Sequence, residues 1–320
     1  MKFLSIPYDK KGGILHRSQP TVSDAMIGIS NDFLSNVLHC TTLISAKSCE
    51  GAEFTATGFF YTSATKGLLL VTNAHVLEGV EKMNITLTPK NEMGFPDFGY
   101  KEEVVVDCSA ENIFFHPDWK KDKGRSVDLA AVRINEPLGL KFYISSTNKD
   151  FILQEAEKEF VGCIEDVLML GYPRGLIDVE NNLPIVRRGI TATSIHVDYC
   201  GVPSFLIDAA CFPGSSGSPV FIIVPPLRVD ATRMSINTQG TVKLVGVLSQ
   251  WIPDISEYRG NVYILPDPPP VPVARGHDAR SEMCVRMGIP LNLGKAVKAK
   301  EIIELEKQAA HDGRKVSWSL

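Results

Sequence analysis

The stretch FPGSSGSPVF, residues 212–221, places a serine between glycines immediately before an apolar strand. Ser216 is flanked within two positions by Gly214 and Gly217. Acyl transfer by serine needs an exposed hydroxyl on a tight turn and backbone N–H groups directed at the oxygen that becomes negative. Glycines on both sides of the serine permit that turn. A plain Gly/Ser hairpin turn has the same composition, so this segment alone leaves both interpretations open.

Two further segments contain the groups that such a serine would need. The apolar strand 67–71 leads into VTNAHV, residues 71–76, so His75 lies in a polar turn at the end of a rigid element, where a general base must be held. Asp128 opens the apolar run SVDLAAVRI, residues 126–134. A carboxylate at that edge can be partly buried only with hydrogen-bond donors, and a histidine ring is the donor that a catalytic triad requires. Taken separately, a surface histidine and a turn aspartate remain alternatives.

Short strand-like segments dominate the chain. They are rich in β-branched, aromatic and apolar residues and are bounded by Gly, Ser or Asn. These segments are 37–45, 53–61, 68–72, 103–107, 129–134, 167–171, 190–197, 204–208, 218–224 and 243–249. Strands at this spacing predict an all-β barrel or sandwich. An amphipathic pattern predicts one helix over Lys295–Ala309, and Phe151–Phe160 reads as a shorter helix or a charged loop.

Composition narrows the class of protein. The 320 residues are 44% apolar and 22% charged, which is ordinary for a soluble globular chain of one or two domains. A net charge of -4 provides no basic field for nucleic acid or for a membrane surface. The start MKFLSIPYDKKGG does not read as a signal peptide, so we expect a cytoplasmic location. Seven cysteines without a CxxC pair predict neither a metal site nor a disulfide framework, and we expect no cofactor.

The order His, Asp, Ser along the chain differs from the orders of α/β-hydrolases and subtilisins. Together the motifs resemble the trypsin-like serine peptidases, and within them the bacterial branch near the high-temperature-requirement (Deg) proteases. The most specific block of this resemblance is IDAACFPGSSGSPV, residues 207–220. It is accompanied by VTNAHV, by DLAAV from Asp128, by LGYPRG at 170–175, by GVLSQW at 246–251 and by NLGKAVKAKEIIEL at 292–305. The resemblance covers roughly residues 36–305.

The resemblance implies an all-β fold of two six-stranded β-barrels of the chymotrypsin kind with a C-terminal helix. It implies a catalytic triad of His75 and Asp128 from the first barrel and Ser216 from the second. It also implies an oxyanion hole formed by the N–H groups of Gly214 and Ser216. The substrate-binding residues that it implies are Ala210 and Cys211 in the primary pocket and Ser249, Gln250 and Trp251 as an edge strand for the peptide.

The same resemblance divides the chain into an N-terminal extension (1–35), a trypsin-like peptidase domain (36–310) and a tail (311–320). An insertion at about 252–291 is rich in proline and charge and could gate the cleft. It contains PDPPPVP, residues 266–272, which predicts extended polyproline II. Ser218 stands where relatives have a second glycine. Ser215 replaces the aspartate of digestive proteases, so their buried N-terminal ammonium switch is not expected.

These observations predict a serine endopeptidase that forms an acyl-enzyme with a protein or peptide substrate. Ala210 favours a small or medium apolar residue before the cleaved bond. Two alternatives stay open: an enzyme kept latent until a regulatory protein partner orders the insertion, and a catalytically silent protease-like scaffold that binds a partner. An α/β-hydrolase esterase is disfavoured by the chain order and by Ser218, where its motif needs glycine.

Overall fold

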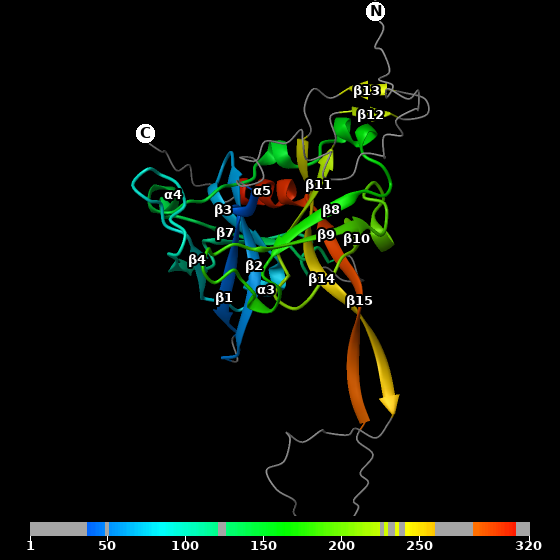
Figure 1. The fold of residues 1–320 in the computed structure, drawn as a ribbon, viewed down its shortest axis with the longest axis horizontal. Coiled ribbons are helices and arrows are strands. Elements are labelled where there is room, and N and C mark those ends of the chain that lie inside the picture. Colours follow the sequence, from blue (N-terminus) through cyan, green and yellow to red (C-terminus); the bar gives the residue numbers. More distant parts are fainter. Residues whose placement is uncertain are drawn as a thin grey trace, which may run out of the picture.

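The computed structural model describes residues 37–48, 51–120, 126–224, 227–229, 234–236, 241–259 and 284–311. They form two β-sheet bodies side by side, with the C-terminal helix α5 (Glu301–His311) beside them (Figure 1). The expected extension at 1–35, the PDPPPVP segment and residues 312–320 of the expected tail lie outside the described residues. No helix among the described residues is long and apolar enough to cross a membrane.

The first body is a seven-stranded sheet in the order β5-β4-β1-β2-β3-β7-β6. Its strands are β1 (Thr41–Lys47), β2 (Glu53–Ser63), β3 (Gly67–Thr72), β4 (Lys82–Leu87), β5 (Glu102–Asp107), β6 (Ile113–Phe115) and β7 (Ala130–Arg133). The two edge strands, β5 and β6, are consecutive in the chain, with only residues 108–112 between them. The sheet must therefore curl around on itself, because its two edges are joined by a short connection.

The second body is a closed barrel in the order β10-β15-β14-β11-β8-β9. Its strands are β8 (Asp166–Gly171), β9 (Ile185–Thr191), β10 (Ser204–Asp208), β11 (Pro219–Val224), β14 (Thr241–Arg259) and β15 (Cys284–Lys298). A separate two-stranded sheet consists of β12 (Leu227–Val229) and β13 (Met234–Ile236). The predicted double β-barrel with a C-terminal helix is confirmed.

The first sheet has seven strands where six were expected, because the segment 102–115 forms two short strands, β5 and β6, in place of one. The Asp107 carboxylate accepts hydrogen bonds from the Ser109 hydroxyl and the Asn112 amide. These side-chain bonds form a turn that competes with the strand ladder. One strand is thereby divided into β5 and β6.

Strands β2 and β3 face two different cores on their two sides. Phe60 and Leu70 pack inside the first sheet. Their neighbours Phe59 and Val71 enter a cluster that lies between the bodies and includes Phe221 of β11. Alternate side chains of a strand point to opposite faces, so a strand buried on both sides reads as the continuous apolar run seen in the sequence.

The prediction of a helix starting at Lys295 is wrong at its beginning. Strand β15 continues to Lys298, and helix α5 starts at Glu301. Ala296 enters the core of the second barrel, and Val297 enters the core between the bodies. Two neighbours that point to opposite cores fit the period of a strand, and only the partner strands β10 and β14 make that pairing visible.

Other boundaries differ by a few residues or more. The predicted strand 190–197 overlaps only the end of β9, which runs from Ile185 to Thr191. Strand β4 was not predicted. The predicted strand 37–45 begins at Thr41, after a short helical turn. The charged segment 151–160 forms two 3-10 turns, Lys149–Phe151 and Glu155–Phe160.

Both ends of the expected insertion belong to strands. Residues 253–259 of β14 pair with residues 284–290 of β15. Figure 1 shows this pair as a two-stranded ribbon that projects from the second barrel. Residues 260–283 lie outside the described part of the chain, so a gating role for the insertion stays a prediction.

Truncating Phe221 tests the core between the bodies. Its side chain is fully buried in the cluster that both bodies share. We expect Phe221→Ala to lower the free energy of unfolding by about 3–5 kcal/mol, the usual cost of removing a core phenylalanine. Urea unfolding followed by circular dichroism measures this. Phe95→Ala is the matched control, because Phe95 is 61% exposed; equal effects would contradict the shared core.

Candidate active site

The loop between β10 and β11 consists of two consecutive turns around Ser216. The Ser215 N–H donates to the Phe212 carbonyl at 3.0 Å, and the Ser218 N–H donates to the Ser215 carbonyl at 3.1 Å. Gly214 and Gly217 have φ values of +89° and +87°. A Cβ on Gly217 would lie 1.9 Å from the Thr57 carbonyl oxygen, so both conformation and space require glycine there.

Thr57 of β2 holds this loop against the first sheet. Its N–H donates to the Ser216 carbonyl at 2.9 Å, and its hydroxyl donates to the Gly214 carbonyl at 3.0 Å. The same hydroxyl accepts a bond from the Tyr172 N–H at 3.0 Å. The Thr72 hydroxyl in turn donates to the Thr57 carbonyl at 2.8 Å. One fully buried residue of the first sheet therefore fixes the position of the serine loop of the second.

His75 lies in the single helical turn α3 (Ala74–Leu77), immediately after β3. Its Nδ1 is 2.7 Å from Asp128 Oδ2, and its backbone N–H donates to Asp128 Oδ1 at 3.0 Å. The Asn73 amide donates to the Asp128 carbonyl at 2.9 Å and ties the two segments together. The carboxylate therefore orients both the backbone and the ring of His75.

Asp128 also accepts a 2.7 Å hydrogen bond from the Ser249 hydroxyl. Burial raises the pKa of this carboxyl, but the hydrogen bonds from His75 and Ser249 and the His75 charge outweigh it, so the net pKa is lowered. The side chain of Asp128 is only 17% exposed, whereas that of His75 is 44% exposed. The arrangement is a buried carboxylate behind an accessible imidazole.

A β-bulge brings Ser249 to this position. Leu248 of β14 pairs with Ala296, and Gln250 pairs with the next residue, Lys295, so Ser249 is the extra residue of the ladder. A bulge redirects a side chain and commonly accompanies an active site. Here it directs the Ser249 hydroxyl to Asp128, while the Ser249 carbonyl accepts a long, 3.4 Å bond from the Ser216 hydroxyl.

These groups line one groove of about 500 Å³. Its lining residues are His75, Trp119, Ser126, Asp128, Ser216, Ser249, Gln250 and Lys295. The backbone N–H groups of Gly214 and Ser216 donate to no other group of the described chain, so they are available to an oxygen anion. The chemistry that fits is attack by the serine hydroxyl with proton transfer to the imidazole.

Three predicted substrate-binding residues remain: Ala210 and Cys211, which are half-buried and buried, and Trp251, whose side chain lies outside the described structure. Ala210 is half-buried beside the serine loop. Cys211 is buried in the core of the second barrel, and this burial raises the pKa of its thiol to about 11. For Trp251 only the backbone is described, as part of β14. The substrate-binding roles of these three residues stay predictions.

Four residues of the site were not predicted from the sequence: Thr57, Asn73, Trp119 and Lys295. Asn73 lies inside the VTNAHV motif, which could have suggested it. The other three carry no local signal. Among the described residues, no cluster of three or more His, Cys, Asp or Glu side chains could hold a metal ion.

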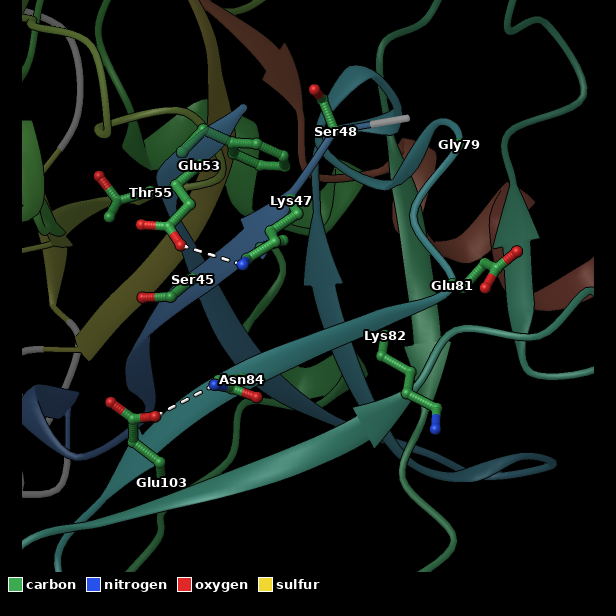
Figure 2. Close-up of a pocket in the computed structure, with 12 residues that line it drawn as sticks. Ser45, Lys47, Ser48, Glu53, Thr55, Gly79, Glu81, Lys82, Asn84 and Glu103 are labelled. Atoms are coloured by element: carbon green, nitrogen blue, oxygen red, sulfur yellow. Dashed lines mark hydrogen bonds and ion pairs between the residues drawn. The ribbon is translucent and has the colours of Figure 1, made fainter. Parts of the chain in front are cut away.

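A larger hollow of about 1020 Å³ lies on the first sheet. Figure 2 shows its polar lining, with an ion pair between Lys47 and Glu53 and a hydrogen bond between Asn84 and Glu103. None of its lining residues is a histidine or cysteine. We therefore assign the chemistry to the smaller groove, which contains the serine, imidazole and carboxylate.

Replacing Thr57 tests the link between the two bodies. Thr57→Val keeps the shape but leaves the Tyr172 N–H and the Gly214 carbonyl unpaired. We expect the free energy of unfolding to fall by about 2–6 kcal/mol, at about 1–3 kcal/mol for each of the two buried unsatisfied groups. Thr57→Ser should retain most of the stability. Thr62→Val, at an exposed threonine of the same strand, is the urea-unfolding control, and a loss as large there would contradict the assignment.

Ser249→Ala tests the hydrogen bonding of Asp128. A carboxyl with a lowered pKa in the folded state adds stability above its unfolded pKa, and this stability is lost as pH falls through the folded pKa. Without the Ser249 hydroxyl the folded pKa of Asp128 should rise. The acid-unfolding midpoint, measured by circular dichroism, should therefore move to higher pH. Ser109→Ala, which removes an exposed bond to Asp107, should leave the midpoint unchanged.

Three solved structures resemble the chain at low identity. An HtrA-type protease, AlgW, with a tripeptide has 15% identity and a TM-score of 0.46, over 90% of this chain and 63% of that chain. A protease from M. tuberculosis in its active form has 14% identity and a TM-score of 0.41, over 92% and 89%. The protease Anisep from Arthrobacter nicotinovorans has 14% identity and a TM-score of 0.44, over 86% and 96%.

The family comparison is more specific. No curated protein matches the chain significantly. Residues 56–222, more than half of the 320, match the trypsin-like peptidase domain family. The matched segment runs from β2 to β11 and contains His75, Asp128 and Ser216. The chain therefore belongs to the trypsin-like peptidase family.

Proposed function

We propose that this chain is a serine endopeptidase with His75, Asp128 and Ser216 as its catalytic triad. The observation that supports it best is the 2.7 Å contact between His75 Nδ1 and Asp128 Oδ2, in the groove that Ser216 also lines. Family membership supplies the substrate class, a protein or peptide. The accessible edge of the imidazole faces the groove, since its other nitrogen is held by the buried carboxylate.

In the proposed reaction the Ser216 hydroxyl attacks the scissile carbonyl and His75 takes its proton. The resulting oxyanion is stabilised by the N–H groups of Gly214 and Ser216. His75 then donates the proton to the leaving amine, which leaves an acyl-enzyme for water to hydrolyse through the same base. Asp128 keeps the ring in the required tautomer and stabilises the imidazolium.

The peptide is proposed to bind along β14. At 241–247 that strand pairs with β11, and the Leu248 carbonyl accepts from the Gly217 N–H. Beyond this point, at Ser249–Trp251, the same edge leaves the ladder with β11, so an extended peptide can add to it. The Ser249 carbonyl, 3.4 Å from Ser216 Oγ, is then placed to accept the N–H of the residue whose carbonyl is attacked.

A second candidate is a latent enzyme or a silent scaffold. The hydrogen bond of the Ser216 hydroxyl goes to the Ser249 carbonyl, and no bond between His75 and Ser216 occurs in the described structure. In free enzymes such bonds are often long and tighten only when substrate binds. Peptidase activity of the pure protein, compared with and without cell extract, separates a latent enzyme from an active one.

Replacing the nucleophile is the direct test. We expect Ser216→Ala to lower peptide turnover by about 10⁶-fold, as loss of a triad serine does. It should also abolish labelling by an alkyl fluorophosphonate, read by intact-mass spectrometry. Ser215→Ala is the matched control, because the buried Ser215 hydroxyl has no hydrogen-bond partner in the described chain and should be dispensable. Labelling that persists in Ser216→Ala would refute the assignment.

A further inference from the structure

Lys295 places a positive charge in the groove of the proposed active site. The bulge at Ser249 sets both Ser249 and Gln250 of β14 against this one residue of β15. The half-buried Lys295 lines the same groove as His75 and Ser216.

The described part of the chain does not pair this charge. The Lys295 ammonium has no hydrogen bond or ion pair with any described residue, and it is not among the groups that shift the pKa of Asp128. The half-buried Lys243 and the buried Lys298 of the second barrel are paired: Lys243 lies 2.6 Å from Glu157, and Lys298 lies 2.6 Å from Asp198. An unpaired ammonium in a partly desolvated groove gains stability from an incoming anion.

The geometry also limits which part of a peptide can supply that anion. In an extended peptide paired with β14, alternate side chains share a face. The side chain of the residue that carries the scissile carbonyl points into the primary pocket, so the second and fourth residues before the bond face His75. Besides His75, the groove is lined by Gln250 and Lys295 of the second barrel and by Trp119 from the first body.

We propose that Lys295 is a specificity residue that selects peptides with an acidic side chain at the second or fourth position before the cleaved bond. This inference rests on the proposed peptidase function and adds the substrate class to it. Asp128 is the one carboxylate among the described residues that line the groove, and it already accepts hydrogen bonds from His75 and Ser249. A basic substrate side chain therefore finds no partner there and is repelled by Lys295.

Peptidyl diphenyl phosphonates test the proposal, because they react with the nucleophile at a measurable rate and carry chosen side chains. Each probe has valine before the phosphorus and glutamate, glutamine or lysine at the second or the fourth position. We expect the glutamate probe to inactivate the wild type roughly 3- to 5-fold faster than the glutamine probe, as a partly exposed ion pair provides. The preference should shrink in high salt.

Variants at Lys295 give the decisive comparison. Lys295→Met should react equally with the glutamate and glutamine probes, and Lys295→Glu should prefer the lysine probe. Lys101→Glu, at an exposed lysine bonded to the Val179 carbonyl, makes the same change of net charge and should keep the wild-type order. Labelling by a small alkyl fluorophosphonate, which has no peptide, should be unchanged in Lys101→Glu. For each Lys295 variant the peptidyl probe rates are divided by that variant's own fluorophosphonate rate, so that the preference between probes is separated from the reactivity of the nucleophile and from folding.

The two proposals fail in different ways. If the wild type is labelled by the small fluorophosphonate but reacts equally with the glutamate and lysine probes at both positions, the role of Lys295 is refuted and the nucleophile stands. A preference for glutamate that survives in Lys295→Met would refute it as well. If the wild type is not labelled by any of these probes, the peptidase proposal falls and the specificity proposal falls with it.

Discussion

The contact between Thr57 and the serine loop is the interaction on which the site depends. The serine and the histidine come from different β-sheet bodies, so no local turn can set the position of one relative to the other. The Thr57 backbone binds the Ser216 carbonyl, and its hydroxyl binds the Gly214 carbonyl. Strand β2 pairs directly with β3, the strand that leads into His75. These bonds therefore hold the serine loop at a defined position relative to His75.

The close packing of the serine loop also results from its contact with Thr57. Gly217 approaches the Thr57 carbonyl so closely that a side chain would collide with it. Gly171 also approaches the loop, and a Cβ there would lie 2.0 Å from the Ser218 hydroxyl and 2.8 Å from the Thr57 hydroxyl. Ser218 replaces the glycine expected from the family, and the missing side chain of Gly171 leaves room for that of Ser218. The loop therefore packs against the rest of the protein at two places that only glycine permits.

Strands β14 and β15 of the second barrel both contribute residues to the groove. The bulge at Ser249 directs one hydroxyl to Asp128, which offsets the cost of burying that carboxylate. The same bulge sets Gln250 against Lys295, which also lines the groove. One extra residue in β14 therefore lies between the hydrogen bonding of the proposed triad and the proposed recognition of the substrate.

The sequence by itself determined the parts that depend on local chemistry. The paired glycines around Ser216, the strand that ends at His75 and the apolar run that opens at Asp128 were readable because turns and strands follow residue type and period. Their chain order then indicated the family, which the match over residues 56–222 shows. Only the tertiary structure decided the rest. Thr57, the bulge at Ser249 and the strand character of Lys295 depend on which strands become neighbours, and that is fixed by long-range packing rather than by any local pattern.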